Sequence, residues 1–71
     1  MNLVFVCNNR KDFENLNKVI EKSKYYATSV NYEFRSLFFN CSSEEDANAL
    51  ESNLQKLIDK NEISGHFELE D

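Results

Sequence analysis

The element that decides the fold of this chain is the stretch from Ser42 to Glu62, SSEEDANALESNLQKLIDKNE. At about 100° of rotation per residue its apolar side chains fall on one stripe, which is typical of a helix packed against a core. That stripe consists of Ala47, Leu50, Leu54, Leu57 and Ile58. Ser42 or Ser43 can cap the first turn, with an acidic residue three positions on, and Asn61 can end the helix in a left-handed conformation. The stretch therefore predicts a long amphipathic helix.

The acidic residues of this helix predict one charged flank. The four that fall together beside the apolar stripe are Glu44, Glu51, Asp59 and Glu62. Lys56 and Lys60 fall on the opposite flank, so no base interrupts the acidic row. Acids in the first turn also offset the helix macrodipole, which is an ordinary structural role. The acids further along have no such role, and we take the whole set as candidate partner-binding residues: Glu44, Glu45, Asp46, Glu51, Asp59, Glu62, Glu68, Glu70 and Asp71.

The N-terminal part of the chain predicts a strand followed by a helix. Leu3 to Cys7 is wholly apolar and rich in β-forming residues, which indicates a central strand covered on both faces. Lys11 to about Tyr25 reads as a helix with one apolar face. That face consists of Phe13, Leu16, Val19 and Ile20.

Residues 30–41, VNYEFRSLFFNC, predict β structure throughout. The run is long enough for one strand of 12 residues or for two strands joined near Arg35 and Ser36. A two-residue hairpin prefers Asn-Gly or Gly-X, and neither is present. The sequence leaves both alternatives open.

The last stretch and the order of elements predict the fold class. His66 to Asp71 alternates, with Phe67 and Leu69 inward and His66, Glu68 and Glu70 outward. The order is β-α-β(β)-α-β, which predicts a single α+β domain over residues 1–71 with two helices on one face of a three- or four-stranded sheet. The arrangement is ferredoxin-like if residues 30–41 form a hairpin.

Charge is divided unevenly along the chain. Residues 1–35 carry six bases and four acids, a net charge of +2, whereas residues 36–71 carry two bases and nine acids, a net charge of −7. Such an acidic half disfavours contact with a phosphate backbone and favours a basic partner. The alternative explanation of the acidic excess is solubility alone.

Part of the sequence resembles the RNA-recognition-motif family. Arg35 to Ser42 resembles the third-strand motif of that family at Arg35 and Phe39, with Leu37 at an aromatic position. Val4 to Asn9 resembles the first-strand motif, and residues 44–50 resemble the start of the second helix. The resemblance implies the ferredoxin-like fold and, as an alternative function, an RNA-binding or regulatory module that uses Phe5 and Phe39.

The parity of the strands leads to a prediction about assembly. Four large apolar side chains share one face with Cys7 and Cys41, and they would form an exposed patch if the helices cover the other face. These residues are Leu3, Phe5, Leu37 and Phe39. We expect them to form the interface of a homodimer, because a small monomer does not leave such a patch in water.

In size, charge and lack of catalytic motifs the chain resembles small acidic phage proteins that act on host proteins, among them a DNA-mimic inhibitor of the histone-like nucleoid protein HU. That resemblance implies a non-enzymatic protein that occupies the nucleic-acid-binding surface of a basic partner, with HU as the first candidate. It implies no direct binding of nucleic acid. A phage-encoded chain would act in the host cytoplasm.

Other chemistry has little support in the sequence. Cys7 and Cys41 lie in apolar runs without a CxxC spacing, and we expect both to be buried free thiols. Gly65 is the only glycine, so a glycine-rich phosphate loop is ruled out. The sequence predicts no enzyme, metal or cofactor, and residues 1–9 are too short an apolar run to cross a membrane or to direct export. We expect a cytoplasmic protein.

Overall fold

The computed structural model describes the backbone of residues 2–70 and the side chains of residues 2–68. The inward side chain expected at Leu69 and the outward one expected at Glu70 therefore lie outside the described residues. In chain order the elements are β1 (Asn2–Cys7), α1 (Arg10–Glu21), β2 (Ser29–Asn31), β3 (Ser36–Asn40), α2 (Glu44–Asp59) and β4 (Gly65–Glu70).

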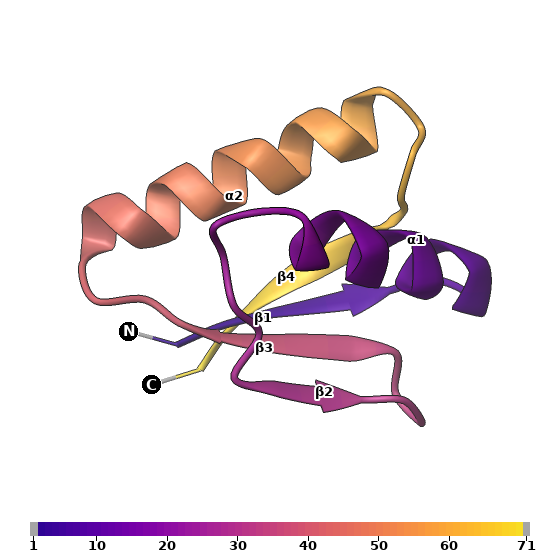
Figure 1. The fold of residues 1–71 in the computed structure, drawn as a ribbon, viewed down its shortest axis with the longest axis horizontal. Coiled ribbons are helices and arrows are strands. Elements are labelled where there is room, and N and C mark those ends of the chain that lie inside the picture. The colour runs from indigo at the N-terminus through magenta and orange to yellow at the C-terminus, as the bar shows by residue number, and fades with distance from the viewer. Residues whose placement is uncertain (1, 71) are drawn as a thin grey trace.

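The four strands form one antiparallel sheet in the order β2-β3-β1-β4. Both helices lie on the same side of it, and the other side carries no helix (Figure 1). The α+β class, the two helices on one face and the central place of β1 are confirmed. Element order and strand order are consistent with a ferredoxin-like arrangement.

Residues 30–41 form a hairpin, which settles the alternative that the sequence left open. Ser29 pairs with Phe38 and Asn31 with Ser36, so four residues form the turn between β2 and β3. The turn does not need Asn-Gly, because the Asn31 Oδ1 accepts a hydrogen bond of 3.1 Å from the Phe34 backbone N–H. Arg35 then takes a left-handed conformation with φ 52°.

The helix-covered face of the sheet is the face that we expected to be open. Leu3 is 1%, Phe5 0%, Leu37 0% and Phe39 2% exposed, and all four belong to one core cluster with residues of α1 and α2. The expectation that they form an exposed dimer interface is therefore wrong. The homodimer itself stays a prediction, and it would have to use other residues.

The turn explains this error. Across β2 and β3, Val30 faces Leu37 rather than Phe38, so residues of opposite parity share a face on the two sides of the turn. A single-strand parity carried from Val30 through Phe38 therefore assigns β3 to the wrong side. β1 could not correct the assignment, because Leu3, Val4 and Phe5 are all buried.

Both helices begin where a side chain caps them. Asn9 accepts a hydrogen bond from the Asp12 N–H at 2.9 Å, and Ser43 accepts one from the Asp46 N–H at 3.2 Å. The first helix ends at Glu21, four residues before the expected Tyr25. There the Ser23 hydroxyl donates to the Ile20 carbonyl and replaces the next helical turn.

The second helix ends as the sequence predicts. Asn61 has φ 61°, its N–H donates to the Ile58 carbonyl, and the Glu62 N–H donates to the Leu57 carbonyl. These two bonds form a Schellman motif, in which the left-handed residue satisfies carbonyls at the helix end.

Gly65 lets β4 approach β1 closely. A Cβ atom at this position would lie 2.2 Å from the Val6 carbonyl oxygen and 2.7 Å from the Phe5 ring.

Among the helices of residues 2–70, none is long and apolar enough to cross a membrane.

Candidate protein-binding site

The outer surface of α2 carries a row of exposed carboxylates. Glu44, Glu51 and Asp59 are exposed, and Glu51 and Asp59 are separated by about 12 Å along the helix axis. Between them lies a shallow hollow of about 420 Å³. The residues that line it are Asn48, Glu51, Ser52, Gln55, Lys56 and Asp59. Lys56 also borders this hollow. A base therefore lies beside the carboxylates, although the helical positions had placed Lys56 on the opposite flank of α2.

One hydrogen bond shows which way this row points. Asn53 Nδ2 donates to the Tyr25 hydroxyl at 2.8 Å, which turns that side of α2 toward the connection between α1 and β2. Glu51 lies about 160° around the helix from Asn53 and therefore points away from that connection. The acidic row, which we define as Glu44, Glu51 and Asp59, thus faces solvent on the side of α2 remote from α1.

The carboxylates of the acidic row are not neutralised within the chain. Among the described side chains, Arg10 forms an ion pair with Glu14 and the His66 Nε2 lies 3.4 Å from the Glu68 carboxylate, and neither contact includes α2. Asp59 accepts one hydrogen bond from Gln55 at 3.1 Å, which leaves its charge in place. The row can therefore attract a cationic surface at distances of about a Debye length.

The other acids that we expected at the site lie elsewhere. Asp46 faces the connection between α1 and β2, where it lines a separate hollow, and Glu45 is exposed in the first turn. Glu62 follows the end of α2 and lines a hollow with Lys11 and Lys18 of α1. Glu68 lies on the helix-free face of the sheet. The side chains of Glu70 and Asp71 lie outside the described residues, so the candidates with described side chains do not form a single surface.

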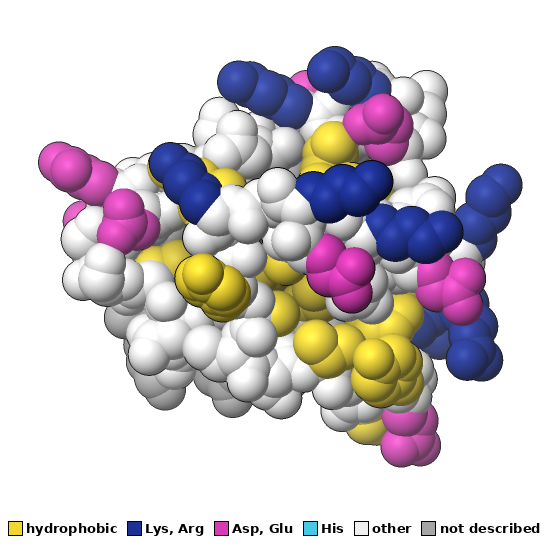
Figure 2. Space-filling model, in the orientation of Figure 1, with side chains coloured by type: hydrophobic (Ala, Val, Ile, Leu, Met, Phe, Trp, Pro, Cys, Tyr) yellow, Lys and Arg dark blue, Asp and Glu magenta, His cyan; other side chains and the backbone are white. Residues whose placement is uncertain are grey.

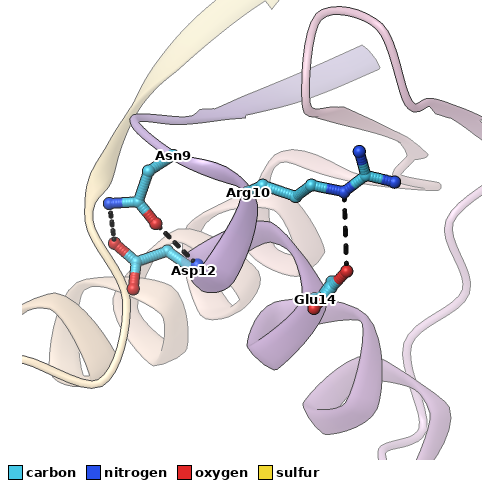
Figure 3. Close-up of polar contacts among 4 residues, drawn as sticks. All are labelled: Asn9, Arg10, Asp12 and Glu14. Carbon is cyan, nitrogen blue, oxygen red and sulfur yellow. Dashed lines mark hydrogen bonds and ion pairs between the residues drawn. The ribbon is translucent and has the colours of Figure 1, made fainter.

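The first helix has its charges arranged differently. At its start Asn9 and Asp12 bond to each other, and Arg10 pairs with Glu14 at 3.6 Å (Figure 3). In the view of Figure 2, Asp and Glu side chains stand at the end where α2 begins, whereas Lys and Arg side chains lie over α1, interspersed with acids, and also beside the far end of α2. Acids and bases therefore occur along both helices, and the surface best suited to a basic partner is the acidic row on α2 rather than a whole side of the molecule.

The thiols are structural groups. Cys7 and Cys41 are both buried, as the sequence predicts, and Cys7 is a free thiol. Burial raises the pKa of the Cys7 thiol to about 11, with the Asp12 carboxylate acting in the same direction and Arg35 opposing. A thiol with a raised pKa is a poor nucleophile at neutral pH. Within residues 2–68, no group of His, Cys, Asp and Glu side chains is placed to hold a metal ion.

The side chains that resemble RNA-stacking residues are not available for stacking. Phe5 and Phe39 are buried beneath the helices, so an RNA site that uses them is ruled out. On the helix-free face the corresponding positions of β1 and β3 are Val4 and Phe38, one residue away in each strand. A one-residue shift moves every side chain of a strand to the other face.

A second surface feature escaped the sequence analysis. Lys24, Tyr25 and Tyr26 lie in the connection between α1 and β2, whereas the sequence placed Lys24 and Tyr25 at the end of the first helix. The sequence pattern could have identified this surface, because aromatic residues such as two adjacent tyrosines are enriched at binding interfaces.

Comparison of the chain with protein-family models, with curated proteins and with solved structures found no match.

Proposed function

We propose that this chain is a non-enzymatic acidic interaction protein that occupies the nucleic-acid-binding surface of a basic protein. The observation that carries the proposal is the acidic row on α2, three exposed carboxylates outside every described ion pair. Carboxylates in this position can take the place of phosphates opposite lysine and arginine. The histone-like protein HU is the first candidate partner.

The density of charge sets the strength of this interaction. α2 is about 24 Å long and carries three acids in the row, about one charge per 8 Å, whereas duplex DNA carries one charge per about 1.7 Å. One copy is therefore a sparse substitute for DNA. Binding should involve about three charge pairs, and the salt dependence should be shallower than that of DNA itself.

Calorimetric titration of HU with this protein tests the proposal. We expect the double reversal Glu51→Lys with Asp59→Lys to abolish binding while leaving the fold intact, because both positions are exposed. A matched control is Glu14→Lys with Glu21→Lys, which changes the net charge by the same amount on α1. The control should retain binding, at the cost of one exposed ion pair between Arg10 and Glu14.

Equal affinity of wild-type protein and the α2 reversal would contradict the proposal. Equal loss in both double variants would show that only net charge matters, and it would remove the acidic row as a specific site.

A further inference from the structure

A hollow of about 500 Å³ lies between the start of α2 and the connection that follows α1. It exists because α1 ends at Glu21, so residues 22–28 cross this end of the sheet as irregular chain instead of covering it as a helix. Its floor is apolar and consists of the buried residues Phe39, Cys41 and Leu50. Figure 2 shows apolar side chains at the surface between the beginning of α2 and α1. Hollows of this size and composition are typical of binding sites.

Two tyrosines at this hollow differ in how they are held. The Tyr25 hydroxyl accepts the hydrogen bond from Asn53, which fixes its ring beside α2. Tyr26 is 83% exposed, and its ring has no aromatic or cationic partner among the described residues. A ring exposed to water in this way leaves its apolar surface unburied, and burial of that surface against a partner would be favourable.

The chain already places a cation at this site. Lys24 Nζ lies 5.7 Å from the centroid of the Tyr25 ring, within the range of a cation–π contact. Opposite, the Asp46 carboxylate accepts a hydrogen bond from the Ser42 hydroxyl through one oxygen, and its second oxygen is open to a further donor. The hollow therefore offers an uncovered ring, an available carboxylate oxygen and an apolar floor.

We infer that this hollow binds an arginine side chain of the basic partner, an inference that rests on the proposed function. A guanidinium group is planar and weakly hydrated, so it can stack on the Tyr26 ring and pair with the Asp46 carboxylate at the same time. Its methylene stem suits the floor formed by Phe39 and Leu50. An anionic ligand is disfavoured, because Glu44 and Glu45 begin the same helix.

In the free chain Lys24 contacts the Tyr25 ring, whereas the arginine would stack on the neighbouring ring of Tyr26. A lysine ammonium is a compact, strongly hydrated charge and loses more hydration when it contacts a ring. Arginine is also the cation found more often on aromatic faces. The site should therefore distinguish arginine from lysine, whereas the acidic row on α2 should attract both alike.

Paired peptides test this difference. Hexa-arginine and hexa-lysine would each be titrated into the whole protein by calorimetry, and the ratio of their dissociation constants would be compared among variants. We expect wild-type protein to prefer hexa-arginine about five-fold, the size of one partly exposed cation–π contact. Tyr26→Leu should reduce the ratio to about one with little change for hexa-lysine. Phe34→Leu is a matched control, because Phe34 is an exposed aromatic ring outside this hollow, and it should keep the preference.

The outcomes separate this inference from the proposed function. An unchanged arginine preference in Tyr26→Leu, or amide NMR shifts confined to the acidic row on α2, would overturn the arginine site and leave the proposed function standing. Failure of both peptides to bind wild-type protein would overturn both. Loss of the preference in Tyr26→Leu, with NMR shifts at Tyr25, Tyr26 and Asn53, would support the site.

Discussion

Phe38 and Phe39 are adjacent in β3 and lie on opposite faces of the sheet, so replacing each by alanine tests the orientation of the whole sheet. Phe39 is 2% exposed between the sheet and the helices, whereas Phe38 is partly exposed on the helix-free face. Truncating a fully buried phenylalanine costs about 3–5 kcal/mol, because it removes transfer free energy and leaves a cavity. A partly exposed ring loses only a fraction of that, about 1 kcal/mol.

Urea denaturation followed by circular dichroism measures this difference. A domain of 71 residues has a free energy of unfolding of roughly 4–10 kcal/mol. Phe39→Ala should therefore lose a large part of its stability, with a melting temperature lowered by at least about 12 °C. Phe38→Ala should show a slightly lower urea midpoint at an unchanged m-value.

The conservative pair Phe39→Leu and Phe38→Leu keeps the comparison readable if Phe39→Ala is largely unfolded. The order of the two positions should be the same with smaller differences. An equal loss at both positions, or a larger loss at Phe38, would refute the register of β3 and place the helices on the other face.

Three further predictions concern the backbone and the thiols. Gly65→Ala should cost about 1–3 kcal/mol in urea denaturation, because its Cβ would collide with the Val6 carbonyl oxygen, and an unchanged midpoint would contradict the close approach of β4. Asn61→Ala should lower the free energy of unfolding by about 1 kcal/mol, because a left-handed conformation strains alanine, whereas Asn61→Gly should be neutral or stabilising. If Asn61→Ala is neutral in the same assay, the left-handed end of α2 at Asn61 is wrong. The folded pKa of Cys7, about 11, lies above its ordinary 9.0, so this thiol favours folding below pH 9 and ceases to do so as pH rises toward 11. The urea midpoint of wild-type protein should fall over that range more steeply than that of Cys7→Ala, and parallel curves would show that the pKa is not raised.

The sequence predicted the elements better than it predicted the faces they present. The α2 stripe and its caps were readable because they depend on residues close in the chain, and the structure places the left-handed residue at Asn61 as expected. The buried face of β3 was not read correctly, because a four-residue turn without glycine reverses parity between Val30 and Phe38. The sequence of β3 nevertheless contains the necessary information. Polar Ser36 and Asn40 share one face of the strand and Leu37 lies on the other, so this alternation predicts that the face of Leu37 is turned toward the core.

The candidate site was predictable only where it lies on one helix. Glu51 and Asp59 follow helical geometry and form a row as expected. Glu62 leaves that row because the chain turns at Asn61, and Glu68 lies on the far side of the sheet. The hollow beside Tyr26 depends on α1 ending at Glu21 and on a bond between residues 28 positions apart, Tyr25 and Asn53. Contacts of that kind depend on the tertiary structure, so they cannot be predicted from the pattern of a single sequence.

Competition for DNA tests the central claim most directly. A fluorescently labelled duplex bound to HU would be titrated with this protein, and the anisotropy of the label would be followed. We expect wild-type protein to release the duplex as it occupies HU, and the Glu51→Lys, Asp59→Lys double variant to leave the anisotropy unchanged. A rise in anisotropy, which would indicate that HU holds the duplex and this protein together, or no displacement at saturating wild-type protein, would contradict the claim that the acidic row of α2 occupies the nucleic-acid-binding surface of HU.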